Sequence, residues 1–188
     1  MFCLFALSVL GAYAIDQALQ PTNLAQWSWL ISPPSALGFF ALLNWTLYGK
    51  ILWSLPPMRL LGIVEVPDLR GRWEGTLASS YDHQQIRCTF EIEQSAHHIL
   101  VWAYFERSTS SPIAANFVTV NHRQYLYFTY SNDTGALSTE GMHAHKGTMW
   151  LESYNGQLRG SYFNDRGNHG DAILRYVGKD LLHCLASS

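Results

Sequence analysis

The first third of the chain almost lacks charge. It has no histidine, and all eight histidines lie further along the sequence. Among residues 1–66 only four side chains are charged: Asp16, Lys50, Arg59 and Glu65. Such a change of composition predicts two regions of different kind, with a boundary near Pro67. The second region has about 120 residues, which is enough to bury a core of its own.

Cysteine and net charge are also scarce. Cys3, Cys88 and Cys184 are odd in number and widely spaced, which excludes a disulfide framework and is typical of a reducing compartment. The formal net charge is −2, so strong electrostatic binding of a DNA or RNA polymer is not expected. The sequence contains no nucleophile elbow, zinc-protease helix or phosphate-binding loop. We therefore predict a protein that is not an enzyme and has no cofactor.

Two apolar runs occupy the N-terminal region. Residues 2–15 are uncharged and mostly apolar, and residues 36–55 form a second apolar run that is interrupted by Asn44 and Lys50. A membrane-spanning helix needs about 20 apolar residues, and proline breaks a helix. Three prolines lie between the runs: Pro21, Pro33 and Pro34. The pattern predicts a two-helix transmembrane hairpin.

We place the transmembrane anchor at 1–57, with spans of about 1–20 and 35–55, and a linker at 58–66. The stretch between the spans has no Lys or Arg, whereas basic residues follow the second span. The positive-inside rule then places the domain at 67–188 in the cytoplasm, behind a two-pass inner-membrane anchor. A secretory signal peptide is the alternative, because Ala12-Tyr13-Ala14 is similar to a cleavage site, and it would invert this topology.

Asn44 lies in the middle of the second predicted span. A lone amide in hydrocarbon needs a partner. It can bond within its own hairpin, or it can join helices of different copies, and the second alternative makes Asn44 a candidate for oligomerisation in the membrane.

After Pro67 the hydrophobic period changes to two. Ile86, Cys88, Phe90 and Ile92 alternate with polar residues, which is typical of a half-buried strand. Eight such segments are expected: 70–79, 84–94, 98–107, 113–121, 123–130, 141–152, 157–164 and 170–178. Turn residues separate them, among them Asn155-Gly156 and Ser110-Ser111-Pro112,. Eight short strands with tight turns predict an up-and-down antiparallel β-barrel of the lipocalin-like kind.

Two residues are expected to close one end of this barrel. Gly71-Arg72-Trp73 at the first strand is similar to the opening of lipocalin-like barrels, where a tryptophan plugs one end. An arginine of the last strand covers that tryptophan, and Arg175 has a suitable position.

The candidate ligand site combines aromatic and polar residues of several strands. Tyrosine offers a flat ring with a polar tip, which suits the stacking of a nucleobase. An arginine in a turn at a barrel mouth can bind phosphate through two hydrogen bonds. The candidates are Tyr104, Tyr127, Tyr162, Asn164 and Arg166. The alternative is that the tyrosines pack in the core or girdle and that Arg166 lies in a solvated turn.

Histidines suggest a second, weaker possibility. His143 and His145 would share one face of a strand, as two metal ligands can, and His97 or His98 could supply a third. A metal-dependent enzyme would follow from such a site. Surface or pocket histidines without a metal are the alternative that we favour.

The chain resembles a known family over nearly its whole length. The resemblance lies in the domain order, in the barrel opening at 68–75, in Leu158–Phe163, and in Arg166, Gly170 and Arg175. These features are similar to the SMODS-associating two-transmembrane, β-strand-rich effectors of bacterial cyclic-oligonucleotide-based anti-phage signalling systems (CBASS).

The resemblance implies a function. The cytosolic barrel would bind a cyclic dinucleotide made by a partner cGAS/DncV-like nucleotidyltransferase, with a cyclic trinucleotide as the alternative ligand. Binding would drive oligomerisation, and the clustered helices would disrupt the inner membrane and kill the infected cell. A membrane-anchored, lipocalin-like carrier of an apolar small molecule is the alternative that the residues leave open.

Overall fold

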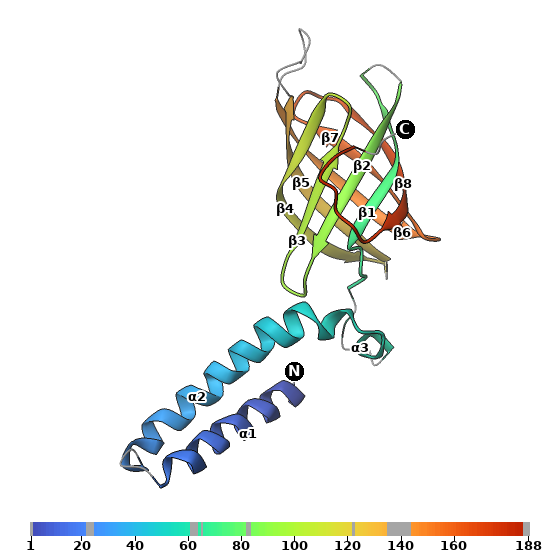
Figure 1. Cartoon of the computed structure of the whole chain (residues 1–188). Coiled ribbons are helices and arrows are strands. Elements are labelled where there is room, and N and C mark those ends of the chain that lie inside the picture. The colour runs from blue at the N-terminus through green and yellow to red at the C-terminus, as the bar shows by residue number, and fades with distance from the viewer. Residues whose placement is uncertain are drawn as a thin grey trace. The chain divides into compact units, whose positions relative to one another are not determined.

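The structure is a computed structural model, and it describes residues 2–21, 25–60, 64, 66–81, 84–121, 123–134 and 144–185. The chain divides into two compact units, Met1–Glu65 and Val66–Ser188, and each is described by itself. The first unit is helical and the second is a β-barrel (Figure 1).

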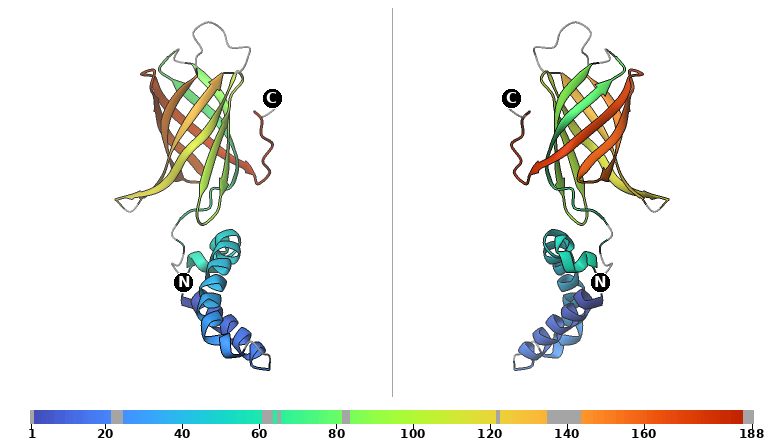
Figure 2. Two further views of the ribbon diagram at one scale, coloured as in Figure 1. Left: turned by 90° about the vertical axis from the view of Figure 1, so that its left-hand side faces the viewer. Right: turned by 90° about the vertical axis from the view of Figure 1, so that its right-hand side faces the viewer.

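The helical unit is a pair of helices followed by short turns. Its elements are α1 (Phe2–Leu19), η1 (Ala25–Trp27), α2 (Ser28–Leu43), the π-helical turn η2 (Asn44–Tyr48), η3 (Leu52–Ser54) and α3 (Pro56–Leu60). Helices α1 and α2 lie side by side (Figures 1 and 2). The Phe5 and Phe40 rings meet edge to face with centroids 6.3 Å apart.

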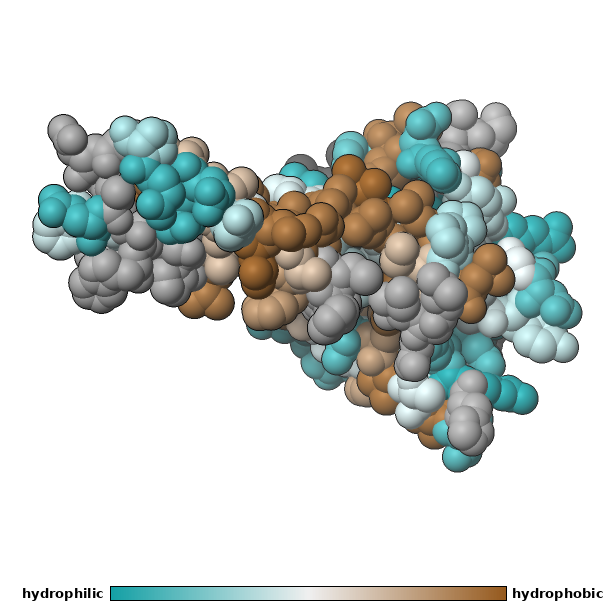
Figure 3. All heavy atoms as spheres, turned by 90° about the horizontal axis from the view of Figure 1, so that it is seen from below, coloured by the Kyte–Doolittle hydropathy of each residue, from teal (hydrophilic) through white to brown (hydrophobic). Residues whose placement is uncertain are grey.

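The surface of this unit is apolar. Leu10 is 62% exposed, Leu37 is 68% exposed and Trp45 is 65% exposed. In Figure 3 apolar residues, coloured brown, gather along the helical unit. Exposed apolar side chains in such number are typical of a surface that interacts with another protein or with a membrane.

Two predictions for this unit are revised. Pro33 and Pro34 lie inside α2 instead of between helices. They fall in its second turn, where each lacks the N–H that would bond to the carbonyl four residues earlier. Among the helices that the structure describes, none is both long and apolar enough to cross a membrane. The predicted hairpin is therefore present as two helices, and its transmembrane character is not confirmed.

The second unit is a closed, antiparallel barrel of eight strands in sequential order, as predicted. The strands are β1 (Gly71–Ser79), β2 (Gln85–Gln94), β3 (Ile99–Tyr104), β4 (Ser108–Val120), β5 (Arg123–Thr134), β6 (His145–Tyr154), β7 (Gln157–Asn164) and β8 (His169–Gly178). Strand β1 pairs with β8 from Arg72 and Gly178 to Ser79 and Gly170, which closes the sheet on itself. Closure leaves few exposed strand edges.

The barrel core follows from the alternation of side chains. Phe90, Val101, Leu126, Met149 and Leu174 are inward-facing and almost fully buried. The Asn155-Gly156 turn is confirmed: both residues have positive φ, 50° and 73°, as a tight two-residue hairpin turn requires.

One end of the barrel, where β1 begins, is closed by Trp73. Its Nε1–H donates to the Leu69 carbonyl (2.9 Å), and its ring meets Tyr176 edge to face at 5.2 Å. Arg175, which was expected to cover this tryptophan, is exposed on the outer face instead. The reason is parity: Leu174 and Tyr176 point inward on β8, so the residue between them points outward.

One predicted turn is wrong. Ser110-Ser111-Pro112 lies inside β4, and the chain reverses earlier, at Phe105–Arg107. Pro112 is accommodated by a register shift between Pro112 and Ala114 in the pairing of β4 with β5. Such bulges are where a strand tolerates a residue without an N–H.

Candidate binding cavity at the barrel mouth

A cavity of about 430 Å³ opens at the barrel end opposite Trp73. Its depth is apolar and its rim is polar. The apolar part is formed by Leu77, Ile86, Phe90, Phe128 and Met149. Sites for small organic ligands have about 300–1,000 Å³ and combine apolar walls with a few placed polar groups. This cavity has the size and lining of such a site.

Asn132 is a buried polar residue of the cavity wall. It is 5% exposed, and its Nδ2 donates to the hydroxyls of Ser110 (2.9 Å) and Ser108 (3.3 Å) on β4. Its Oδ1 is buried and has no hydrogen-bond partner in the described structure. A buried acceptor of this kind costs about 1–3 kcal/mol unless a donor reaches it. Because Asn132 lines the cavity, this oxygen is a candidate acceptor for a donor group of a ligand.

Two tyrosines flank this amide. The Tyr162 hydroxyl donates to Ser79 Oγ (3.0 Å) across the mouth. Tyr130 packs over Gly147, where any Cβ would collide with its ring, and it meets the His145 ring edge to face at 6.4 Å. Burial raises the pKa of Tyr130 above its ordinary value, so the phenol is neutral at pH 7. Both tyrosines line the cavity, and a tyrosine combines a flat apolar ring with a polar hydroxyl group.

The β7–β8 turn carries the cationic part of the rim. Asn164 Oδ1 accepts hydrogen bonds from the backbone N–H groups of Arg166 (3.1 Å) and Asn168 (3.0 Å). Gly167 has φ +79°, a value that favours glycine. Asn164 thus shapes the turn, and Arg166 is exposed at the mouth.

A second arginine, Arg107, reaches the cavity from the β3–β4 turn. Two guanidinium groups at one mouth favour an anionic ligand, because each can donate two parallel hydrogen bonds to phosphate or carboxylate oxygens.

The structure thus brings Tyr162, Asn164 and Arg166 together in the cavity lining, whereas Tyr104 and Tyr127 lie elsewhere. Tyr127 points outward on β5 and is 39% exposed. The centroids of the Tyr127 and Tyr125 rings lie 6.5 Å apart, and the Tyr125 ring in turn meets the Trp150 ring edge to face. Parity again explains the difference, because Leu126 and Phe128 take the inward positions of β5.

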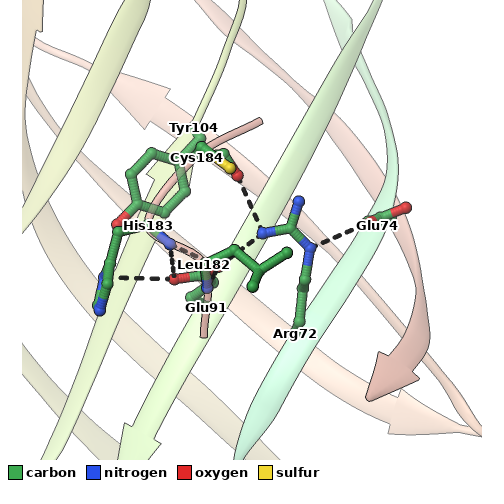
Figure 4. A network of polar contacts seen from close by, with 7 residues as sticks. All are labelled: Arg72, Glu74, Glu91, Tyr104, Leu182, His183 and Cys184. Carbon is green, nitrogen blue, oxygen red and sulfur yellow. Dashed lines mark hydrogen bonds and ion pairs between the residues drawn. The ribbon is translucent and has the colours of Figure 1, made fainter. Parts of the chain in front are cut away.

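Tyr104 also points outward, on β3, and is covered by the C-terminal segment (Figure 4). Its hydroxyl lies 3.3 Å from His183 Nδ1. Burial, and after it the carboxylate of Glu91, raises the pKa of Tyr104. This side chain therefore belongs to a polar network on the outside of the barrel.

An ion pair forms the centre of that outer network. Arg72 Nη1 donates to Glu91 Oε1 (2.6 Å) and to the Cys184 carbonyl (3.0 Å). Glu91 also accepts the backbone N–H groups of Leu182 (2.8 Å) and His183 (3.1 Å) (Figure 4). The C-terminal segment buries this pair, since the side chains of Arg72 and Glu91 are only 5% and 0% exposed.

The histidines do not assemble into a shared metal site in the described part of the chain, where no group of three potential metal ligands is found. His145 lines the cavity. His97 and His98 lie in the β2–β3 turn at the other end of the barrel, where His98 meets Ser95 Oγ at 2.8 Å. His143 lies outside the described residues.

Several cavity residues were not predicted as site residues: Ser79, Arg107, Ser110, Tyr130 and Asn132. A signal for Tyr130 and Asn132 was available, because both share the inward parity of Leu126 and Phe128 on β5. Arg107 had no such signal, because the turn that carries it was placed at the wrong residues.

A closed eight-stranded barrel with a cavity of this kind at one mouth has the architecture of a small-ligand receptor. The protein family described as "Cap15, cyclic dinucleotide receptor domain" matches residues 64–175. The chain belongs to this family. CD-NTase-associated protein 15 of Staphylococcus schleiferi is 24% identical over 129 residues, which cover 68% of this chain and 70% of that protein. The resemblance to the effectors of the bacterial CBASS systems is thereby confirmed.

Proposed function

We propose that the barrel binds a cyclic dinucleotide in its mouth cavity and that the chain acts as a CBASS effector. The observation that carries this proposal is the buried, unpartnered oxygen of Asn132, in a cavity of about 430 Å³ that Arg107 and Arg166 also line. Membership of a cyclic dinucleotide receptor family supports it.

The roles follow from the chemistry of each group. Arg166 and Arg107 bind the phosphates through charge-assisted hydrogen bonds. Asn132 Oδ1 accepts an N–H of a base, and the rings of Tyr130 and Tyr162 contact the base faces. Asn164 positions Arg166 by holding the turn.

The remaining parts of the function concern the helical unit and the cell. In this proposal the ligand is a product of a cGAS/DncV-like nucleotidyltransferase, and the receptor is not an enzyme. The exposed apolar side chains of α1 and α2 hold the protein at the bacterial inner membrane, with the barrel in the cytoplasm. Ligand binding drives self-association, and the clustered helices disrupt the bilayer. Ligand binding shifts this equilibrium only if the oligomer binds the ligand more tightly than the monomer does.

A carrier of an apolar molecule is the second candidate. The apolar depth of the cavity, with Phe90, Phe128 and Met149, favours it. The polar rim and the unpartnered amide are better suited to a polar ligand, because an apolar one would leave Asn132 Oδ1 without a donor.

Thermal unfolding of the full chain in detergent tests the proposal, with a panel of cyclic di- and trinucleotides and their linear forms. A ligand at 100 times its Kd adds about 2.7 kcal/mol of stability, which raises Tm by about 10 °C. A shift with a cyclic form, absent with its linear form, supports the receptor. The absence of any shift, together with lipid retained through purification, would support the carrier.

Arg166→Ala tests the phosphate contact. We expect binding to weaken about 10- to 100-fold, since a hydrogen bond to a charged group contributes about 1.5–3 kcal/mol, while the Tm without ligand is unchanged. Arg159→Ala is the matched control, because Arg159 is exposed on the outer face of β7 and lies 5.8 Å from the Tyr154 ring. Equal affinity in both variants would exclude Arg166 from the site.

A further inference from the structure

The chain continues after β8 as a short segment that crosses the outer wall of the barrel and is bound there through its backbone. We call residues 182–184 the C-terminal strap. Two successive backbone N–H groups of the strap, those of Leu182 and His183, donate to the carboxylate of Glu91 (2.8 and 3.1 Å). The carbonyl of its last residue accepts a hydrogen bond from Arg72 Nη1 (3.0 Å) (Figure 4). The buried ion pair thus binds the main chain of the strap.

The backbone of the strap has the form of an anion-binding turn. His183 has a φ of 54°, in the left-handed region that few residues other than glycine adopt. A residue of this conformation lets successive N–H groups converge on one anion. Here the anion is the carboxylate of Glu91, whose side chain is 0% exposed. Because a strained backbone persists only where its surroundings fix it, we ascribe the conformation of His183 to its contact with Glu91.

The side chains of the strap contribute little to its attachment. Leu182 is 61% exposed, the side chain of His183 is 62% exposed, and Cys184 is exposed as well. In the part of the chain that the structure describes, no residue after Leu174 belongs to the hydrophobic core. Segments with few buried apolar contacts open locally at a much lower free energy than core strands do. The strap can therefore leave the wall while the barrel stays folded.

The wall under the strap is also a wall of the cavity. From outside, the strap contacts three neighbouring strands, through Arg72 on β1, Glu91 on β2 and Tyr104 on β3. Successive side chains of a strand point to opposite faces of the sheet. The residues next to two of these contacts, Phe90 on β2 and Ala103 on β3, accordingly line the cavity. A ligand in the cavity and the strap therefore lie on opposite faces of the same strands.

We propose that the C-terminal strap orders this wall when it is bound and thereby raises the affinity of the cavity for its ligand. The bound strap connects three strands, so less conformational freedom remains to be lost when a ligand orders their inner faces. Such coupling is reciprocal, because the ligand strengthens the binding of the strap by the same factor by which the strap strengthens the binding of the ligand. The inference rests on the cyclic dinucleotide binding of the proposed function and adds a regulatory element outside the cavity.

A pair of substitutions at His183 tests the strap. His183→Pro removes the N–H that bonds to Glu91 and fixes φ at about −65°, which excludes the observed conformation. His183→Asn keeps the N–H, and asparagine tolerates a left-handed φ. Both variants lose the imidazole, so the comparison isolates the backbone. In the full chain in detergent, titrated in a calorimeter with the cyclic dinucleotide that raises the Tm of the wild type most, we expect His183→Pro to bind at least about fivefold more weakly than His183→Asn.

Deletion of residues 182–188 removes the strap altogether and should weaken ligand binding as much as His183→Pro does. Urea unfolding of each protein checks that its barrel is folded. Equal affinities of His183→Pro and His183→Asn would overturn the proposal, and so would a wild-type affinity in the deletion variant, because the strap would then only stabilise the fold. A wild type without affinity for any cyclic nucleotide contradicts the proposed function itself, and this inference with it.

Hydrogen exchange of the wild type tests the reciprocal effect. We expect the same cyclic dinucleotide to slow the exchange of the Leu182 and His183 amides by about the factor by which deletion of the strap weakens ligand binding, as measured by mass spectrometry of the C-terminal peptide. The Asn155-Gly156 turn, at the barrel end opposite the cavity, is the control and should exchange at the same rate with and without ligand. Unchanged exchange of the strap in a wild type that binds the ligand would refute the coupling.

Discussion

The barrel has two buried polar clusters, one around Glu91 on its outer face and one around Asn132 in its cavity. They differ in how their polar atoms are hydrogen-bonded. Outside, Glu91 accepts hydrogen bonds from Arg72 and from the backbone of Leu182 and His183 (Figure 4). Inside, Asn132 donates to two serines, but its buried oxygen has no partner in the described structure. The chain's own C-terminal segment completes the outer cluster. The Asn132 oxygen of the inner cluster has no such partner among the described residues, and this difference is why we propose the inner cluster, and not the outer one, as the binding site.

Removal of Glu91 from the outer cluster should cause the largest loss of folding stability. Glu91→Ala leaves the buried Arg72 with Glu74 as its remaining carboxylate partner (2.8 Å), so we expect a loss near the lower end of the about 3–5 kcal/mol that breaking a buried pair costs. Urea unfolding of the full chain should show this loss. Arg87→Ala is the control, because the Arg87–Glu106 pair (3.4 Å) is exposed and contributes little. If both variants unfolded at the same urea concentration, the outer cluster would not stabilise the fold.

Asn132→Leu should affect ligand binding more than stability. The variant removes the two hydrogen bonds that Asn132 Nδ2 donates to Ser110 and Ser108, so we expect the stability to fall by about 1–3 kcal/mol. Affinity for the cyclic nucleotide should fall about 10-fold or more, as for any lost hydrogen bond to a ligand. Tyr104→Phe, on the outer network, should keep the affinity of the wild type. Isothermal calorimetry distinguishes the two, and an unaffected affinity in Asn132→Leu would place the ligand elsewhere.

The smallest expected effect is a difference in thiol reactivity between the two cysteines of the barrel. Cys88 faces the core, and burial raises the pKa of its thiol to about 12; Cys184 is exposed. In a Cys3→Ser background, a thiol reagent at pH 8 should modify Cys184 at once and Cys88 only after unfolding, because the thiolate is the reactive form. Rapid modification of both would show that the barrel wall opens readily.

The same buried thiol gives a pH dependence with a defined sign. The unfolded thiol ionises near its ordinary pKa, while the folded one keeps its proton until about pH 12. The stabilisation is therefore complete below the unfolded pKa and is lost as pH rises toward the folded one. Cys88→Ala should remove this alkaline part of the stability profile.

The sequence alone determined the barrel and its strand order. Alternation of apolar and polar residues and turn pairs such as Asn155-Gly156 are local signals, and they act between residues that are neighbours in the chain. They predicted β1, β2, β7 and β8 to within one residue at each end, whereas the predicted β3, β5 and β6 miss one end by three or four residues. Strand β4 begins five residues earlier than expected, because Pro112 is accommodated by a bulge. Asn164 and Arg166 were placed at the mouth for a local reason, since they lie in one hairpin turn, whereas Tyr162 was chosen for its aromatic ring, as Tyr104 and Tyr127 were.

Only the tertiary structure decided which tyrosines face the ligand and which face outward. Alternation along β3 already indicates from the sequence that Tyr104 points outward. The sequence does not indicate what covers it, because the covering residues, Leu182–Cys184, come from the far end of the chain and contact β2 and β3. The partners of Asn132 lie on β4, more than twenty residues away. Contacts over such distances depend on how the barrel closes, and no local pattern encodes which polar atom remains without a partner once it has closed.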